Sequence, residues 1–341
     1  MAWRVLQLVG SPTSAFFCEL SELYARGCIE ALADDPRFVF VIAHVSPGGV
    51  WRFPDTLSAA AIEAAAPLDF AAAMTHLAGL ALDAALPQMF CGPGMTDYRG
   101  LLDVLGLPYL GNQPTQMALA ADKTMAKAVV AAAGVAVPAA QVVAADETPT
   151  LDLPLVIKPN AADNSDGIAL VRAPGELAAA LTEARTHGQA IIAETYIPLG
   201  REVRCAVIER DGALIGLPLE EYNVDRETRP VRRAGDKLKR GDDNGLSLAA
   251  KDAASSWMVD ASDPIVADVH AQAFACYRAL GLRHYGLFDF RIDPDGRPWF
   301  LEAGPYCSFA PGSVVATMMR ARGESLNIFL ATSLADWLGL D

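Results

Sequence analysis

The chain has few cysteines, and they follow none of the usual patterns. Its 341 residues contain six cysteines, with no CxxC spacing and no dense framework. Disulfide frameworks are typical of small secreted proteins, and CxxC pairs are typical of zinc and redox sites. We therefore expect the cysteines to be reduced and the protein to be cytoplasmic.

Long hydrophobic runs are missing as well. No uncharged apolar run reaches the roughly 20 residues that span a bilayer. The segment 1–10 leads directly into an expected strand and lacks the longer apolar region and cleavage site of a signal peptide. We therefore expect no membrane partner.

Basic residues are in the minority, with 27 Lys and Arg against 41 Asp and Glu, which gives a net charge of −14. This balance argues against a nucleic-acid partner but leaves room for a local basic pocket that binds phosphates. The hydrophobic content of 52% and the mean hydropathy of +0.24 predict a globular protein with a large core. The length suits two or three subdomains.

Alternating strand and helix patterns predict three units with boundaries at 1–111, 112–200 and 201–341. The first unit reads as a small doubly wound α/β domain. The apolar patterns predict strands at 3–9, 38–43, 88–91, 141–144, 154–158, 189–194, 202–209 and 213–219. They predict helices at 17–32, 57–84, 114–133, 174–188 and 263–280. The charged segment 223–252 has few apolar residues, so it is either functional or mobile.

The segment 285–304 predicts a β-hairpin, because two apolar runs flank the turn signal Asp295-Gly296. A two-residue turn there places Asp289 directly opposite Glu302. Like charges that face each other across a ladder destabilise it, so a buried pair needs a cation or a proton. Two carboxylates on a rigid hairpin beside phosphates are a usual way to hold Mg²⁺. The alternative is a solvated pair on an edge hairpin, but the aromatic neighbours favour burial.

Three other segments carry candidate ligand-binding residues. Lys158 ends a buried strand and precedes the polar loop 160–167, an arrangement that suits phosphate oxygens. Glu194 ends the strand 189–194, where exposed backbone can bind an adenine edge and a later carboxylate, Glu202, can accept both ribose hydroxyls. Lys123 lies on an Ala-rich helix. The alternatives are a lysine that extends along the surface to water, an ordinary strand end and a solvated helix face.

In this order, the segments around Lys123, Lys158, Glu194, Asp289 and Glu302 resemble the ATP-grasp superfamily, and most closely the D-alanine–D-alanine ligases. The resemblance covers nearly the whole chain. It implies an α/β fold of the α+β ATP-grasp kind, in which an N-terminal doubly wound α/β domain precedes a two-subdomain ATP-grasp fold. It also implies ATP and Mg²⁺ as cofactors, small carboxylate and amine substrates, and a possible homodimer.

The resemblance also implies roles for single residues. The residues that it assigns to the nucleotide are Lys123, Lys158, Ser165, Gly167, Glu194, Thr195, Tyr196, Ile197 and Glu202. Asp289 and Glu302 match the metal carboxylates. Glu19 matches the residue that touches the first substrate, and Tyr222 matches its partner. Arg291 and Lys158 are expected to stabilise the charge that develops in the reaction, while Ser313 closes the segment that replaces the ligases' Ser-Pro-Gly ending.

The departures from the family matter equally. Gly304 stands where the third, amide, metal ligand is usual, and Leu287 stands where an arginine is usual. Arg291 could supply that charge, because it lies two residues after Asp289 on the same face of the strand. The segments 91–97 and 305–313 also differ, and both belong to the expected acceptor pocket. Aromatic and large apolar residues that could line a wider pocket are Trp51, Met95, Tyr98, Tyr306 and Phe309.

The sequence therefore predicts a ligase that joins a carboxylate to an amine in specialised metabolism. ATP would convert the carboxylate to an acylphosphate, and closure of the loop 223–247 would exclude water. Two other readings stay open. One is an ATP-grasp enzyme of another outcome, such as a carboxylase-type enzyme or a phosphotransferase. The other is a nucleotide-binding module without catalysis.

Overall fold

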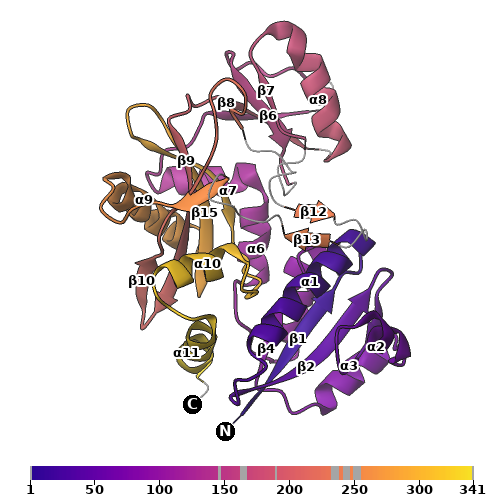
Figure 1. The fold of residues 1–341 in the computed structure, drawn as a ribbon. Helices are drawn as coiled ribbons and strands as arrows, with labels where there is room; N and C mark the ends of the chain where they lie inside the picture. The colour runs from indigo at the N-terminus through magenta and orange to yellow at the C-terminus, as the bar shows by residue number, and fades with distance from the viewer. Residues whose placement is uncertain are drawn as a thin grey trace.

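The computed structural model describes residues 2–144, 147–161, 167–188, 190–231, 238–240, 246–248 and 255–339. Within these ranges the chain forms two four-stranded sheets, one six-stranded sheet and one two-stranded sheet. Helices flank the larger sheets, and the N-terminal sheet and the β6–β8 sheet lie at opposite ends of the molecule (Figure 1). The α/β fold that the sequence predicts is confirmed, while the unit boundaries at 111/112 and 200/201 stay predictions.

The N-terminal sheet has the strand order β3-β2-β1-β4, in which β1 pairs in parallel with β2 and β4. Its strands are β1 Trp3–Gly10, β2 Phe38–Ser46, β3 Val50–Arg52 and β4 Ala84–Pro87. Its helices are α1 Ala15–Ala31, α2 Ala59–Ala64, α3 Phe70–Gly79, α4 Gly92–Met95 and α5 Asp97–Val104. The parallel core with crossover helices agrees with the predicted doubly wound domain.

The third parallel strand was predicted four residues too late. We expected a strand at 88–91, but β4 covers Ala84–Pro87 and pairs from Val5↔Ala84 to Leu8↔Pro87. Its alanines suit a helix as well as a buried strand, so the sequence pattern assigned their beginning to the preceding helix. The residues after β4 instead form the loop at the carboxyl end of the sheet.

The predicted helix 114–133 is two helices, α6 Pro114–Ala121 and α7 Lys123–Ala132. Asp122 leaves the helical conformation between them and accepts a hydrogen bond from the Met125 N–H at 2.8 Å. An aspartate at this position stabilises a new helix start because it satisfies an unpaired backbone donor. The break places Lys123 in the first turn of α7.

The second four-stranded sheet has the order β5-β8-β6-β7. Its strands are β5 Ala140–Val143, β6 Leu155–Pro159, β7 Ala169–Val171 and β8 Ile191–Thr195. The 3₁₀ turn η1 Pro174–Glu176 leads into α8 Leu177–Thr186, which packs against β6, β7 and β8. A single apolar cluster joins this helix to the sheet.

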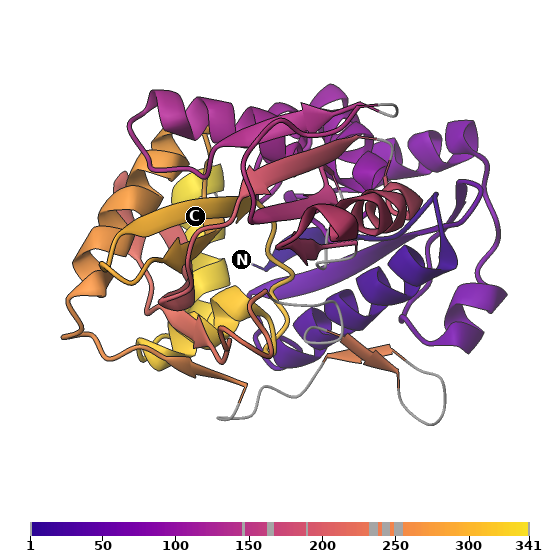
Figure 2. The same ribbon diagram turned by 90° about the horizontal axis from the view of Figure 1, so that it is seen from above.

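The largest sheet has the order β14-β11-β9-β15-β16, with β10 paired to β9. Its strands are β9 Arg201–Arg210, β10 Ala213–Gly216, β11 Glu220–Tyr222, β14 Ser256–Met258, β15 Tyr285–Ile292 and β16 Pro298–Gly304. Helices α7 and α9 Ile265–Ala279 pack on it, and α10 Val314–Ala321 and α11 Leu326–Leu338 follow. The separate pair β12 Leu238–Arg240 and β13 Leu246–Leu248 lies beside α1 (Figures 1 and 2).

The hairpin register confirms the predicted pair and corrects the turn. Asp289 lies opposite Glu302, but Ile292 pairs with Pro298, so the turn is longer than two residues. A register shift between Asp289 and Phe290 restores the pairing further along the hairpin. A bulge of this kind inserts one extra residue in one strand, and here it offsets the longer turn.

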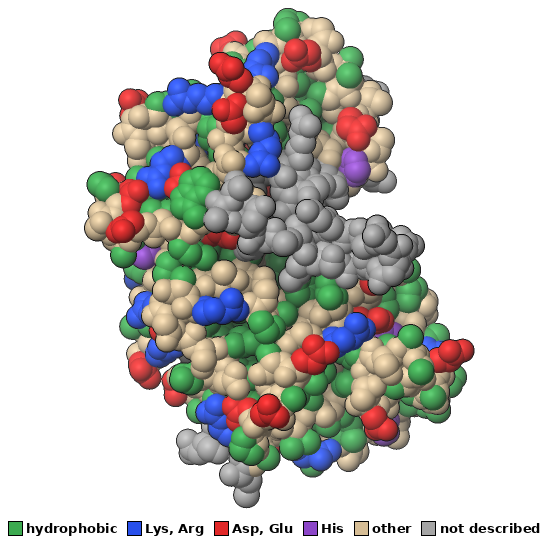
Figure 3. Space-filling model, in the orientation of Figure 1, with side chains coloured by type: hydrophobic (Ala, Val, Ile, Leu, Met, Phe, Trp, Pro, Cys, Tyr) green, Lys and Arg blue, Asp and Glu red, His purple; other side chains and the backbone are tan. Residues whose placement is uncertain are grey.

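No helix in the described ranges is both long and apolar enough to cross a membrane. All six cysteines are unpaired and buried, as expected of reduced thiols. On the described part of the face in Figure 3, acidic and basic side chains are interspersed.

Candidate active site

A pocket lies between the β6–β8 sheet and the β9–β15–β16 part of the large sheet. The residues that line it are Pro138, Val156, Lys158, Ile168, Glu194, Thr195, Tyr196, Ile197, Glu202, Val231, Asp289, Arg291, Leu301 and Glu302. The predicted hinge, the ribose carboxylate, one phosphate lysine and both metal carboxylates are among them. Segments that are far apart in the sequence thus meet in one pocket in the arrangement that the sequence order implied.

Glu194 is at the centre of a buried charge cluster. Its carboxylate lies 2.9 Å from Lys158 Nζ and 3.2 Å from Lys127 Nζ, and all three side chains are almost fully buried. Burial works to raise the pKa of Glu194, but the two ammonium groups outweigh burial and lower it. The carboxylate is therefore charged and forms ion pairs with two lysines at once.

Lys127 is a residue that the sequence reasoning missed. Burial, with the nearby Lys158 charge, lowers the pKa of Lys127 to about 8 although Glu194 opposes the shift. Its Nζ donates to Phe300 O at 3.2 Å and lies 5.6 Å from the centre of the Phe300 ring. Its spacing of one helical turn from Lys123 was the available signal, since residues i and i+4 share a helix face.

Lys123 is buried and does not lie on a solvated helix face. Its Nζ is 3.8 Å from Glu302 Oε2 and 3.5 Å from Asn160 O. The Asn160 side chain in turn accepts bonds from the N–H and hydroxyl of Thr124. The start of α7 is therefore connected both to the loop after β6 and to the metal-type carboxylate on β16.

Asp289 lies between Glu302 on one neighbouring strand and Arg204 on the other. Arg204 Nε donates to Asp289 Oδ1, and its Nη2 donates to Oδ2 at 2.6 Å. Burial lowers the pKa of the Arg204 guanidinium, but Asp289 outweighs burial and holds it well above its usual value. The compensating cation for the two facing carboxylates is thus an arginine that the sequence reasoning did not name.

Arg291 lies on the predicted face of its strand, the face of Asp289, but its hydrogen bonds are to other residues than the metal carboxylates. It lies opposite Glu202 in the ladder and donates to Glu202 Oε2 at 2.7 Å. It also donates to Pro230 O at 2.9 Å and lies 5.3 Å from the centre of the Tyr196 ring. These contacts place Arg291 beside the predicted adenine hinge and ribose carboxylate. Its predicted catalytic role stays a prediction.

The remaining predicted residues lie in different parts of the fold. Gly167 has a positive φ of 68°, and a Cβ there would lie 2.9 Å from the His187 ring, so only glycine fits without strain. Ser165 lies outside the described residues. Glu19 lies on α1, the Tyr222 hydroxyl donates to Glu220 Oε2 at 2.7 Å, and Ser313 caps α10. The substrate roles of these three residues stay predictions.

The aromatic residues proposed for a wide acceptor pocket lie mostly in the core. Trp51 is buried and stacks on Tyr98 with ring centroids 5.6 Å apart in the N-terminal apolar cluster. Phe309 belongs to the core cluster under α11. Tyr98 and Tyr306 are only partly buried, and the centre of the Tyr306 ring lies 5.8 Å from that of Phe90. Contact of either residue with a substrate stays a prediction.

Comparison with known proteins decides the family. Residues 128–334 match the family described as D-ala D-ala ligase C-terminus. A D-alanine–D-alanine ligase from Bordetella petrii is 32% identical over 237 residues, which cover 67% of each chain. One from Synechococcus is 30% identical over 258 residues and covers 72% of this chain and 74% of the relative. This chain belongs to the D-alanine–D-alanine ligase family.

Solved structures agree on the ATP-grasp fold over nearly the full length. The VanG D-Ala:D-Ser ligase from Enterococcus faecalis superposes with a TM-score of 0.78 at 22% identity, covering 98% of this chain and 99% of the other. A D-alanine–D-alanine ligase from Bacillus anthracis, solved with ATP, superposes at 0.70 with 19% identity, covering 97% and 95%. As a member of the D-alanine–D-alanine ligase family, the chain is a ligase that forms C–N bonds and uses ATP and Mg²⁺.

The side chains of this ligase fit a magnesium ion. Mg²⁺ is usually held by one or two carboxylates together with the phosphates of the substrate. Asp289 and Glu302 face each other across the ladder and both line the pocket. A carboxylate offers about four lone-pair positions, so the two bonds from Arg204 leave Asp289 further acceptor capacity. The set is therefore sufficient without an amide at position 304.

The buried cluster around Glu194 yields a stability prediction. Glu194→Gln removes the carboxylate that is paired with Lys127 and Lys158, and breaking a buried pair costs about 3–5 kcal/mol. We expect the free energy of unfolding to fall by about that amount in urea denaturation at pH 7. Glu183→Gln is the matched control, because Glu183 forms an exposed pair with His187. Equal unfolding free energies for the two variants would contradict the role of Glu194.

Proposed function

We propose that the chain joins two amino acids through an amide bond, with ATP converting the first carboxylate to an acylphosphate. The observation that carries this proposal is the pocket in which Lys158, the hinge 194–197, Glu202, Asp289 and Glu302 meet. Carboxylates and amines do not condense in water without activation. A site with phosphate-type cations, a metal-type carboxylate pair and a nucleotide hinge can supply that activation.

In this proposal each group has a defined task. The hinge backbone orients the adenine, and Glu202, held by Arg291 at 2.7 Å, accepts the ribose hydroxyls. Lys123 and Lys158 neutralise the phosphate oxygens from fixed, buried positions. When bound to Asp289 and Glu302, Mg²⁺ supplies Lewis-acid stabilisation of phosphoryl charge. The loop 223–247, of which residues 232–237 and 241–245 lie outside the described residues, would exclude water from the acylphosphate.

Arg204 is our candidate for the charge that is lost at Leu287. Leu287 and Asp289 are two residues apart in β15, so they share a face, and Arg204 reaches that face from β9. Its guanidinium already bonds to the carboxylate that faces Glu302. Because Arg204 is held by two bonds and by the ring of Tyr222 at 5.6 Å, its charge is preorganised.

Arg204→Met should therefore lower kcat by about 10²–10³, the usual loss for one preorganised charge. We expect a smaller change in KM for ATP, because Arg204 is absent from the pocket lining. Arg210→Met is a control, since that arginine pairs with Glu324 away from the pocket. ADP release under saturating ATP measures the effect, and circular dichroism checks the fold. A loss of less than about tenfold would restrict Arg204 to a structural role.

Gly304→Asn should restore a third metal ligand. A Cβ at this position would meet its nearest atoms, in Leu287 and Tyr306, at 3.9 Å, which is ordinary contact. The asparagine would share the strand face of Glu302, two residues away. We expect the Mg²⁺ concentration for half-maximal ADP release to fall several-fold. Gly304→Ala adds the same Cβ without a ligand, so equal responses of the two variants would disprove the idea.

We propose the substrates from the names of the relatives and from the segments in which this chain departs from the ligase pattern. The relatives are named for D-alanine and, in one structure, D-serine, so D-alanine is the first candidate for one of the two amino acids. The segments 91–97 and 305–313 differ from the ligase pattern on the acceptor side. We therefore propose a second amino acid other than D-alanine, and a product used in specialised metabolism. Cytoplasmic localisation and a homodimer are part of the same proposal.

A substrate panel tests the proposal directly. Purified protein with ATP and Mg²⁺ is offered D- and L-amino acids singly and in pairs, while ADP release and product mass are followed. We expect ADP release that depends on the second amino acid, and a product equal in mass to both substrates minus water. Release that requires bicarbonate or an alcohol would indicate another ATP-grasp reaction. ATP-induced thermal stabilisation without hydrolysis would indicate a binding module.

A further inference from the structure

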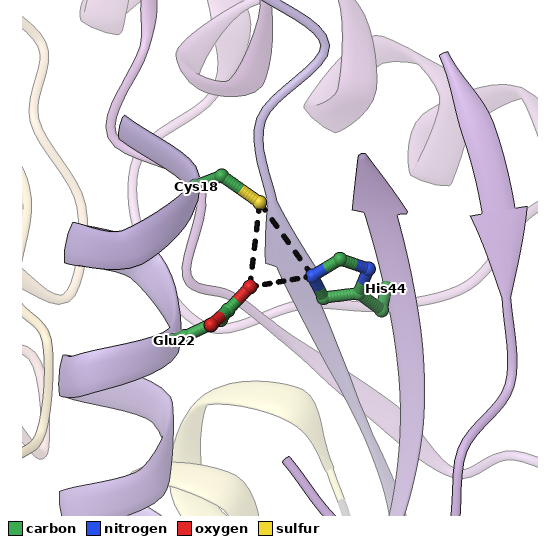
Figure 4. A group of neighbouring side chains, drawn as sticks. All are labelled: Cys18, Glu22 and His44. Carbon is green, nitrogen blue, oxygen red and sulfur yellow. Dashed lines mark hydrogen bonds and ion pairs between the residues drawn. The ribbon is translucent and has the colours of Figure 1, made fainter. Parts of the chain in front are cut away.

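Three metal-ligating side chains converge outside the nucleotide pocket, in the N-terminal domain (Figure 4). Cys18 and Glu22 project from α1, and His44 projects from β2 near its carboxyl end. Cys18 Sγ lies 3.5 Å from His44 Nε2 and 3.4 Å from Glu22 Oε1. His44 Nε2 lies 2.8 Å from Glu22 Oε1, so the three atoms surround a single point.

The fold holds these atoms together from two directions. Cys18 and Glu22 are four residues apart, so they share a helix face. At the end of β1, Gly10 has φ +102°, and a Cβ there would lie 2.1 Å from Val45 O. Only glycine allows this close approach, after which Ser11 N–H donates to Val45 O at 2.8 Å. The entry to α1 is therefore fixed against the strand that carries His44.

The spacing of the three atoms suits a tetrahedral Zn²⁺ ion. With Zn–S near 2.3 Å and Zn–N and Zn–O near 2.0–2.2 Å, tetrahedral ligand atoms lie about 3.4–3.6 Å apart. Both contacts of Cys18 match this spacing, and the His44–Glu22 contact needs to open by roughly 0.6 Å. We propose that Cys18, Glu22 and His44 bind one Zn²⁺ ion, with water as the fourth ligand.

The composition of the site selects the ion. A thiolate with an imidazole and a carboxylate suits Zn²⁺, whereas Mg²⁺ prefers oxygen ligands alone. The Cys18 and His44 side chains are buried, while Glu22 is 23% exposed, which gives water access on the Glu22 side. The site depends on these three side chains and not on the ligase reaction, so the two proposals can fail separately.

A nucleophilic cysteine explains the cluster less well. Reactive cysteines lie in electropositive, partly exposed surroundings, whereas Cys18 is buried with the Glu22 carboxylate 3.4 Å from its Sγ. Hydrogen bonds alone are the other description of the cluster, because the Cys18 thiol can donate to Glu22 or to Val45 O, which lies 3.8 Å from Sγ. In both cases Sγ, Nε2 and Oε1 lie within 3.5 Å of one another. A single cation bonds to all three atoms.

Zinc content provides the first test. Purified protein is equilibrated with one equivalent of Zn²⁺, freed of excess ion by gel filtration and analysed by atomic emission. We expect about one Zn²⁺ per chain in the wild type, and at least about 10–100-fold weaker retention in His44→Gln and Cys18→Ser, as for losses around metal sites. Cys28→Ser, a buried cysteine of the same helix, should retain the ion. Wild-type protein that retains none would overturn the proposal, as would variants that retain as much.

Cobalt substitution tests the ligands without relying on a variant that folds. Co²⁺ added to the wild-type protein should give the thiolate-to-cobalt charge-transfer absorption and the intense visible bands of a tetrahedral site. Addition of Zn²⁺ should remove both, whereas an equal concentration of Mg²⁺ should leave them unchanged. Cys28→Ser should show the same spectrum as the wild type. A spectrum without a sulfur band would exclude Cys18 as a ligand and contradict the site.

Discussion

The structure depends on neutralising the charges that are buried in the β9–β15–β16 ladder. Asp289 faces Glu302 on one side and Arg204 on the other, and the next inward pair is Arg291 with Glu202. Between β15 and β9 each of these charges has a partner of opposite sign, whereas Glu302 faces the like charge of Asp289. A slip of one residue would turn the charged side chains of β15 to the opposite face, and a slip of two would place Asp289 opposite Glu202. The pairing thereby fixes the register of the strands that carry the proposed metal and ribose carboxylates.

Pairing of opposite charges also connects the separate sheets at the pocket. Glu194 on β8 pairs with Lys158 on β6 and with Lys127 on α7, while Lys123 on α7 lies near Glu302 on β16. The lysines of helix α7 therefore contact acidic residues of both sheets that form the pocket walls. Because each buried group would be costly if left alone, the pairs position the lysines and carboxylates that the proposed chemistry requires.

The sequence could predict the residues that stand in readable local patterns. Lys158 at a strand end and the hairpin with its turn signal are of this kind, and Asp289 opposite Glu302 was correct because a bulge offset the longer turn. Arg204 was not predictable, since its partner is 85 residues away and it is one of several charged residues in its own strand. The Cys18 cluster was missed for a similar reason, because only the fold brings His44 to α1.

The two positions at which this chain departs from the family's metal site are neighbours in space, so we interpret the two replacements as coupled. Leu287 and Gly304 are direct partners in the ladder, two pairs from Asp289 and Glu302, with Phe288 and Ala303 between them. Leu287 thus replaces the arginine that is usual in the family with an apolar side chain. Gly304 replaces the usual amide residue and has no side chain. The positive charge returns from β9 as Arg204, on the same face. In the proposed function, Arg204 would keep a positive charge near the phosphoryl site, while Leu287 and Gly304 would make the wall beside it apolar and smaller. Such a change would preserve activation by ATP and alter the surroundings of the group that reacts next.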